Sequence, residues 1–206
     1  MTSRASRRGP SNGNNIMQII GGCARNIVLN VPPGIGVRPT AGRARKALFD
    51  NLGGRLAGSC VLDLCAGSGA LALEAASRGA VKAVLVESDP RHIRVIEENI
   101  ERVRRTGVEC EFDVIQASAG NVAAYIGRLP SPGVIFADPP YAQSAALFGE
   151  ILGSPRLRER AAGALVVWEI PDAPGSVGEF LKQPLLADRR IRKFGGTDFL
   201  LGEVPV

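Results

Sequence analysis

Short apolar runs alternate with segments of helical periodicity from residue 60 to residue 170. Apolar runs of this length bounded by turn residues predict buried strands, whereas apolar residues spaced three and four positions apart predict helices. We expect strands at 60–64, 83–87, 111–115, 133–137 and 164–170, and helices at 70–78, 91–105, 121–128 and 145–152. Such alternation is typical of βαβ units, so the pattern predicts a parallel sheet covered by helices on both faces.

The two ends of the chain follow a different pattern. Residues 185–192 and 198–203 flank Phe194-Gly195-Gly196-Thr197 without an intervening helix, which predicts an antiparallel hairpin at the sheet edge. Near the N-terminus, the apolar runs 17–22 and 27–31 predict a second, smaller β-hairpin. The spacing of the following apolar residues predicts a helix that begins at Thr40, its expected N-cap, and ends at Leu56.

The organisation along the chain follows from these patterns. Residues 1–15 are rich in Ser, Gly, Asn, Pro and Arg and cannot bury apolar area, which predicts a disordered basic tail. Residues 16–56 form the hairpin and helix of an N-terminal extension, and residues 57–206 form one α/β domain. A chain of 206 residues is long enough for one domain with a substantial core.

Positive charge is concentrated in the first quarter of the chain. Residues 1–55 hold nine Lys or Arg and a single acid, Asp50, which gives +8, whereas the whole chain carries +5. A basic region on an otherwise near-neutral protein is the footprint expected of polyanion binding. We therefore interpret residues 16–56 as a polyanion-binding extension, and the arginines of the tail as solvated.

Composition argues against membrane and metal functions. No apolar run approaches the ~20 residues that span a bilayer, and residues 1–15 lack the apolar core of a signal peptide. These features predict a soluble, cytoplasmic protein with no membrane partner. The four cysteines form no C-x-x-C pair and His92 is the one histidine, which predicts reduced thiols and no metal site.

Asp138-Pro139-Pro140-Tyr141 follows the apolar run 133–137 directly. Proline neither continues a helix nor donates to a strand ladder, so the four residues predict a stiff turn at the end of a strand. Asp138 and the carbonyl of Pro139 could each accept one N–H of an exocyclic amino group, and Tyr141 offers a ring on which a base can stack. An ordinary strand-ending turn would use the same residue types.

A second motif carries the cofactor prediction. The segment from Cys60 to Ala72 is a buried strand, a glycine turn and the start of a helix. The spacing Gly67-x-Gly69-x-x-Ala72, with Glu87 ending the next strand, is close to the dinucleotide fingerprint. Asp63 argues against that interpretation, because a carboxylate before the turn would repel a pyrophosphate and suits the cationic amino-acid end of S-adenosylmethionine. Glu87 would then accept hydrogen bonds from the ribose hydroxyls.

Together, the loop from Asp63 to Gly69, Glu87 and Asp138-Pro139-Pro140-Tyr141 resemble the class I S-adenosylmethionine-dependent methyltransferases that act on exocyclic amines. Further matches at 19–22, 38–40 and 68–71, with Arg43 and Arg45, resemble the bacterial 16S ribosomal RNA guanine-N2 methyltransferases of the RsmD type. The resemblance implies a Rossmann-like, seven-stranded, mostly parallel sheet with a small N-terminal hairpin that helps to hold RNA. It also implies ribosomal RNA or the small ribosomal subunit particle as partner, and we expect a monomer.

The expected site residues fall into three groups. The catalytic group is Asp138, Pro139, Pro140 and Tyr141. The cofactor group is Asp63, Cys65, Ala66, Gly67, Gly69, Glu87, Ser88, Ser118, Ala119 and Asp138. The substrate group is Arg25, Arg38, Thr40, Arg43, Arg45 and Tyr141. The chain departs from the family at Ser118, where an Asp or Asn often contacts the adenine amino group, and in a hairpin that is less basic than usual.

Other functions stay open on the sequence. An adenine-N6 methyltransferase of DNA or RNA, or a protein-glutamine methyltransferase, would need the same acceptors, although the basic N-terminal region favours nucleic acid. The glycine spacing also permits an NAD-linked oxidoreductase, and the basic region permits an RNA-binding protein without catalysis. We interpret Trp168 as a core residue and His92 as a solvated one.

Overall fold

The computed structural model describes residues 16–33 and 39–206, with side chains from residue 42 onward in the second range. The predicted tail and Arg38 lie outside these ranges. One seven-stranded sheet has the order β3-β2-β1-β4-β5-β7-β6. Its strands are β1 (Cys60–Leu64), β2 (Lys82–Glu87), β3 (Glu111–Gln116), β4 (Val134–Ala137), β5 (Leu165–Glu169), β6 (Ala187–Phe194) and β7 (Thr197–Glu203). The first five pair in parallel and β7 pairs antiparallel to β5 and β6, which confirms the predicted Rossmann-like fold.

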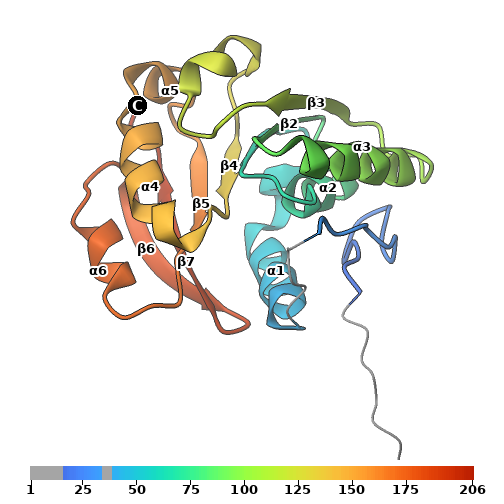
Figure 1. The fold of residues 1–206 in the computed structure, drawn as a ribbon, viewed down its shortest axis with the longest axis horizontal. Helices are drawn as coiled ribbons and strands as arrows, with labels where there is room; N and C mark the ends of the chain where they lie inside the picture. The colour runs from blue at the N-terminus through green and yellow to red at the C-terminus, as the bar shows by residue number, and fades with distance from the viewer. Residues whose placement is uncertain (1–15, 34–38) are drawn as a thin grey trace, which may run out of the picture.

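Helices cover both faces of the sheet (Figure 1). They are α1 (Pro39–Leu52), α2 (Ala70–Ser77), α3 (Pro90–Arg104), α4 (Ser144–Gly153), α5 (Pro155–Arg160) and α6 (Ser176–Leu181), with a 3₁₀ turn, η1 (Gly53–Leu56), after α1. The N-terminal segment, α1, α2 and α3 share one hydrophobic layer, here the α1–α3 layer. Residues of α4, α5 and α6 belong to the other, the α4–α6 layer.

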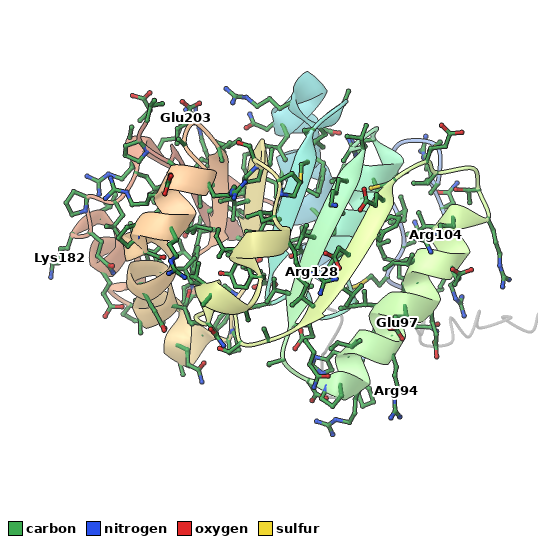
Figure 2. The ribbon with its side chains drawn as sticks, turned by 90° about the horizontal axis from the view of Figure 1, so that it is seen from above. Arg94, Glu97, Arg104, Arg128, Lys182 and Glu203 are labelled. Atoms are coloured by element: carbon green, nitrogen blue, oxygen red, sulfur yellow. The ribbon has the colours of Figure 1, made fainter. Side chains whose placement is uncertain are left out.

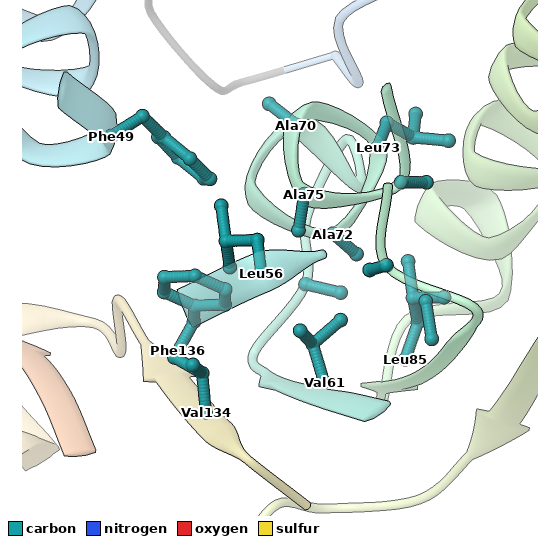
Figure 3. Packing of buried hydrophobic residues seen from close by; sticks show 14 of the residues in the cluster. Phe49, Leu56, Val61, Ala70, Ala72, Leu73, Ala75, Leu85, Val134 and Phe136 are labelled. Atoms are coloured by element: carbon teal, nitrogen blue, oxygen red, sulfur yellow. The ribbon is translucent and has the colours of Figure 1, made fainter. Parts of the chain in front are cut away.

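The central strands are buried on both faces, which explains why their sequences read as continuous apolar runs. Residues of β1 alternate between layers, since Val61 belongs to the α1–α3 layer and Leu62 to the α4–α6 layer. Figure 3 shows the α1–α3 layer, in which Phe49 of α1 meets Phe136 of β4 with ring centroids 5.5 Å apart. Asp63 interrupts this apolar pattern in the middle of the sheet, and its side chain points toward α2 in the α1–α3 layer.

Two local predictions are wrong. The helix expected at 121–128 is two 3₁₀ turns, η2 (Val122–Ala124) and η3 (Ile126–Arg128). The buried Tyr125 separates them with φ −125°, and its hydroxyl donates to the carbonyl of Ala119 at 2.8 Å, which holds the chain in tight turns. The helix expected to start at Thr40 starts at Pro39, where the fixed φ of proline suits a first helical position. The short helices α5 and α6 were not predicted.

The C-terminal hairpin has the predicted turn. Gly195 and Gly196 both have positive φ, 53° and 95°, as a two-residue turn with the twist of the flanking strands requires. A Cβ atom on Gly195 would lie 2.4 Å from the backbone nitrogen of Ala44, so the turn packs directly against α1. Glycine is therefore needed there both for its conformation and for the close approach.

The N-terminal hairpin is reduced to a single bridge between Gln18 and Val28 and is attached to α2 by a buried carboxylate. Glu74 is fully buried and accepts the backbone N–H groups of Ile20 and Gly21 at 2.7 and 2.8 Å, and Nε of Arg78 at 2.9 Å. A buried charge is tolerated when it is paired in this way. The hairpin is thus fixed to the α/β domain.

Within the described ranges, no helix is long and apolar enough to cross a bilayer.

Candidate active site

A cavity of about 610 Å³ opens at the carboxyl edge of the parallel strands. It lies where the chain order reverses, between β1 and β4, which is where open α/β sheets bind ligands. Loops after β1, β2, β3, β4 and β5 form its wall, and α1 and the β6–β7 hairpin close it from the side. Most of the expected site residues lie on this wall: Arg45, Asp63, Cys65, Ala66, Gly67, Glu87, Ser88, Ser118, Ala119, Asp138, Pro139, Pro140 and Tyr141.

The loop after β1 is shaped by positive φ angles. Cys65, Gly67 and Gly69 have φ values of 61°, 57° and 75°. Gly67 lines the cavity and donates its N–H to Glu87. Gly69 does not line the cavity; it is the N-cap residue of α2, and a Cβ atom there would lie 3.2 Å from Leu85. Its role in the structure is the tight turn and the close packing of α2 on β2.

Asp63 is a buried carboxylate on the cavity wall, with 2 % of its surface exposed. One of its oxygens accepts the backbone N–H of Ala72 at 3.1 Å. Burial, and to a smaller extent the charges of Asp138 and Glu87, raise the pKa of Asp63 to about 7, against the lowering effect of that hydrogen bond. A group of mutually repelling carboxylates in one cavity favours a ligand that brings positive charge.

Glu87 is held by the backbone around it. Its Oε2 atom accepts the N–H of Gly67 at 2.8 Å, and its Oε1 atom accepts those of Ser88 and Asp89 at 2.7 and 2.9 Å. Nδ1 of His92 lies 3.6 Å from Oε2 of Glu87. His92, interpreted from the sequence as solvated, is half-buried and lines the cavity beside the carboxylate that ends β2. Asp89 caps α3, since its side chain accepts the backbone N–H of Arg91 at 2.8 Å.

Cys65 and the segment Ser118–Ala119 complete the half of the cavity nearest β1 to β3. Burial raises the pKa of the Cys65 thiol to about 12, with the neighbouring carboxylates adding to the effect, so this thiol stays protonated and unreactive. Ser118 is exposed and Ala119 is buried. The carbonyl of Ala119 accepts a hydrogen bond from the hydroxyl of the buried Tyr125, which fixes the loop after β3.

The Asp138–Tyr141 turn directly follows β4, as expected. Pro139 is buried, whereas Asp138 is exposed and Tyr141 has 42 % of its surface exposed. A 3₁₀ turn, η4 (Tyr141–Gln143), leads into α4, whose first residue Ser144 is fully buried. Nε1 of Trp168 donates to Oγ of Ser144 at 3.0 Å. The predicted core residue Trp168 therefore also anchors the end of the turn.

Glu169 is a cavity residue that the sequence analysis missed. β4 and β5 pair in parallel with Ala137 opposite Trp168, so one further step in register sets Asp138 beside Glu169. Neighbouring strands lie about 4.8 Å apart, and residues two positions beyond Phe136 and Val167 face the same α1–α3 layer. A glutamate at the end of a predicted strand was the available signal, but its neighbour depends on strand order.

Comparison with known proteins identifies the family. Residues 17–199 match the family described as "Conserved hypothetical protein 95". The chain belongs to this family. It is 34% identical over 130 residues to Ribosomal RNA small subunit methyltransferase D of Escherichia coli K12, a match that covers 63% of this chain and 62% of that relative, less than two thirds of its length.

Two solved structures match nearly the whole chain. A hypothetical protein of Thermus thermophilus has 39% identity and a TM-score of 0.69, covering 92% of this chain and 100% of its own. A putative methyltransferase of Escherichia coli has 27% identity and a TM-score of 0.70, covering 93% and 99%. These matches confirm the resemblance to methyltransferases inferred from the motifs.

The residues expected to bind substrate do not all lie at the cavity. Arg45 lines the cavity and is 8 % exposed, whereas Arg43 on α1 and Arg25 in the N-terminal hairpin are exposed and do not line it. Thr40 lies in the first turn of α1, with its side chain outside the described part. Among the described residues, no group of His, Cys, Asp or Glu is placed to hold a metal ion.

Because the pKa of Asp63 is raised, replacing this carboxyl by a neutral group should increase the stability of the folded protein at high pH but not at low pH. Between its ordinary pKa and about 7, the folded protein keeps a proton that the unfolded chain has lost, so the contribution of Asp63 to stability falls as pH rises through this window. Asp63→Asn should raise the melting temperature at pH 8 by roughly 5 °C and change it little at pH 4. Thermal unfolding across this range measures the difference.

The control is Glu109→Gln, which removes one exposed carboxylate near β3. Its melting temperature should follow that of the unmodified protein at both pH values. If Asp63→Asn raises the melting temperature no more at pH 8 than at pH 4, the ionised carboxylate of Asp63 does not destabilise the folded protein.

Proposed function

We propose that this chain transfers a methyl group from S-adenosylmethionine to the N2 amino group of a guanine in small-subunit ribosomal RNA. The observation that carries the proposal is the meeting of a buried acid, Asp63, and the Asp138–Tyr141 turn on one cavity at the switch point of the sheet. The relative named as a ribosomal RNA small subunit methyltransferase supports the RNA substrate.

The donor set of the cavity fits this cofactor better than a dinucleotide. Asp63, Glu87 and Asp138 all line it, and a pyrophosphate there would be repelled by three carboxylates. Asp63 would bind the ammonium group of the cofactor, and Glu87, fixed by three backbone donors, would bind its ribose. Ser118 and Ala119 would lie against its adenine. The bound cofactor supplies an electrophilic methyl group on a sulfonium centre.

The Asp138–Tyr141 turn would position the acceptor base. Asp138 and the Pro139 carbonyl accept the two hydrogens of the amino group, which directs the nitrogen lone pair out of conjugation with the ring. The cofactor would supply its methyl group to this nitrogen with loss of the carbon–sulfur bond, and Asp138 would take the proton that the amine releases. Tyr141 stacks on the base, a contact worth ~1–3 kcal/mol that requires an unpaired or flipped nucleotide.

Glu169 supports guanine over adenine as the base. Beside the amino group, guanine carries N1–H, a donor, whereas adenine carries N1, an acceptor. Asp138 and Glu169 are neighbours in the register of β4 and β5, so two carboxylates face one edge of the base. They match the consecutive donors of guanine, and Glu169 would repel the unprotonated N1 of adenine.

The RNA backbone would lie across α1 and the edge strand β6. Arg43 on α1 and Arg190 and Arg192 on β6 are exposed and form no ion pair with another described residue. Alternate residues of β6 share a face with Phe194, which packs in the α1–α3 layer, so both arginines lie on the side that α1 covers. The protein would act as a cytoplasmic monomer on naked RNA or on the small ribosomal subunit particle, with residues 16–56 as its RNA-binding extension.

Removing the carboxylate of Asp138 tests the proposed reaction. Asp138→Ala should lower kcat at least 100-fold, the usual loss for one oriented group at a reacting centre, while the affinity for S-adenosylmethionine changes less than about threefold. Transfer of labelled methyl to ribosomal RNA, followed by nucleoside analysis, measures the rate and identifies the product. Glu97→Gln, on the outer face of α3 (Figure 2), should leave both values unchanged. Normal turnover by Asp138→Ala, or label in N6-methyladenine or protein, would contradict the proposal.

Glu169→Gln tests the choice of base. The amide keeps the size of the side chain but presents a donor as well as an acceptor, so methylation of guanine should fall about 10-fold or more in kcat/KM. Methylation of adenine in matched single-stranded RNAs should rise relative to guanine. An unchanged guanine rate and an unchanged guanine-to-adenine ratio would rule out this role for Glu169.

Neutralising the β6 arginines tests the RNA surface. The double variant Arg190→Gln/Arg192→Gln should bind RNA more weakly, and the slope of log affinity against log salt should fall by about 1.4, since each lost contact to single-stranded phosphate removes ~0.7. The matched control, Arg156→Gln/Arg160→Gln, removes two exposed charges from α5, at the opposite end of the sheet from the hairpin turn (Figure 1). Equal affinity and slope in both double variants would rule out the β6 surface.

A further inference from the structure

Arg45 is the buried cation of the cavity wall. It has 8 % of its surface exposed and projects from α1, whose neighbouring residues Arg43 and Lys46 are exposed. Its Nη2 atom donates to the carbonyl of Gln18 at 2.6 Å. Its Nε atom is buried and has no hydrogen-bond acceptor among the described residues. Arg45 is therefore set apart from the outer basic surface and directed inward.

The charge of Arg45 has no direct ion pair within the described part of the chain. Glu74 is close enough to influence it, since burial lowers the pKa of Arg45 and the charge of Glu74 opposes this effect. However, the Glu74 carboxylate is already engaged by Ile20, Gly21 and Arg78. Buried charges in proteins are normally paired, so the cavity beside Arg45 is suited to an anionic group of a ligand.

Arg45 lies at the end of the cavity formed by the loop after β1. Gln18, which holds its guanidinium, follows Met17, whose sulfur accepts the hydroxyl of Ser68 at 3.1 Å. Met17, Ser68 and the first residues of α2 line the same wall. The other basic residue among the described cavity residues, His92, lies 3.6 Å from Glu87. The amino-acid end and the ribose end of the expected cofactor would thus each have one basic residue.

We propose that Arg45 binds the α-carboxylate of S-adenosylmethionine while Asp63 binds its α-ammonium group. This inference rests on the proposed function. The amino-acid end of the cofactor is a zwitterion, and the wall of this cavity offers it a buried cation from α1 and a buried anion from β1. Gln18 positions Arg45, so the N-terminal extension takes part in cofactor binding and not only in contacts with RNA.

The experiment compares two ligands that differ only in the carboxylate. Calorimetry at pH 8 measures the affinities of S-adenosylmethionine and of decarboxylated S-adenosylmethionine for the unmodified protein, Arg45→Gln and Arg45→Lys. The unmodified protein should prefer the intact cofactor about 10- to 100-fold, as expected of a charge-assisted hydrogen bond. Arg45→Gln should lose this preference by binding the intact cofactor more weakly, with the affinity for the decarboxylated ligand changed less than about threefold. Arg45→Lys should be intermediate, because an ammonium group keeps the charge but not the fork of donors.

Lys46→Gln is the matched control, because it removes an exposed positive charge from the next residue of the same helix. It should leave both cofactor affinities unchanged. Affinity of Arg45→Gln for RNA should also stay near that of the unmodified protein, which separates this role from phosphate binding.

Three results would overturn the inference. They are equal affinity of the unmodified protein for the two ligands, a loss in Arg45→Gln that is the same for both ligands, and a loss of RNA affinity with cofactor affinity intact. The first needs no variant and so does not depend on the folding of Arg45→Gln. If the unmodified protein binds neither ligand, the proposed function fails together with the inference; if it binds and methylates RNA but ignores the carboxylate, only the inference fails.

Discussion

β1 and β4 lie side by side in parallel, with Leu64 opposite Ala137, and both strands end at this point. The glycine loop that follows β1, just after Asp63, and the turn that begins with Asp138 therefore leave the sheet at the same edge. Because β2 and β3 extend the sheet on one side and β5 on the other, the carboxyl ends of five strands surround a single cavity. The β1–β4 pairing sets the glycine loop beside Asp138, and the pairings of β2 with β1 and of β5 with β4 bring Glu87 and Glu169 to the same edge.

The carboxylates at this edge of the sheet repel one another. Asp63, Glu87 and Asp138 share the cavity, and the burial of Asp63 makes its ionised form unfavourable in the folded protein. The apolar layers on both faces of β1 supply the free energy that holds this arrangement. A cationic ligand would relieve the repulsion and would stabilise the folded state by its binding free energy. Strain of this kind is expected where a site is built for binding and not for stability.

The N-terminal extension is structurally part of the site. Ile19, Leu48 and Phe49 belong to the same hydrophobic layer as α2 and α3, and Glu74 fixes the hairpin to α2 through two backbone donors. The boundary near residue 56 that composition suggested is crossed by these contacts. Under the proposed function, an extension attached in this way would align RNA with the cavity, because the exposed Arg43 and the buried Arg45 both lie on α1.

The sequence by itself determined the features that local spacing encodes. Apolar runs and helical patterns identified the five parallel strands and the four longest helices, and the Gly195-Gly196 turn identified the C-terminal hairpin. The Asp63–Gly69 loop and the Asp138–Tyr141 turn were recognisable because their residues are contiguous.

Only the tertiary structure decided which residues meet. Glu169 became a neighbour of Asp138 through strand order, and His92 reached Glu87 through the orientation of α3 on β2. The hydroxyl of buried Tyr125 replaced a predicted helix with two tight turns. Arg45 and Arg43 have the same local character, yet the packing of α1 on the sheet buries one and exposes the other. Contacts between segments distant in sequence set these outcomes, since burial and charge pairing depend on packing that no local pattern contains.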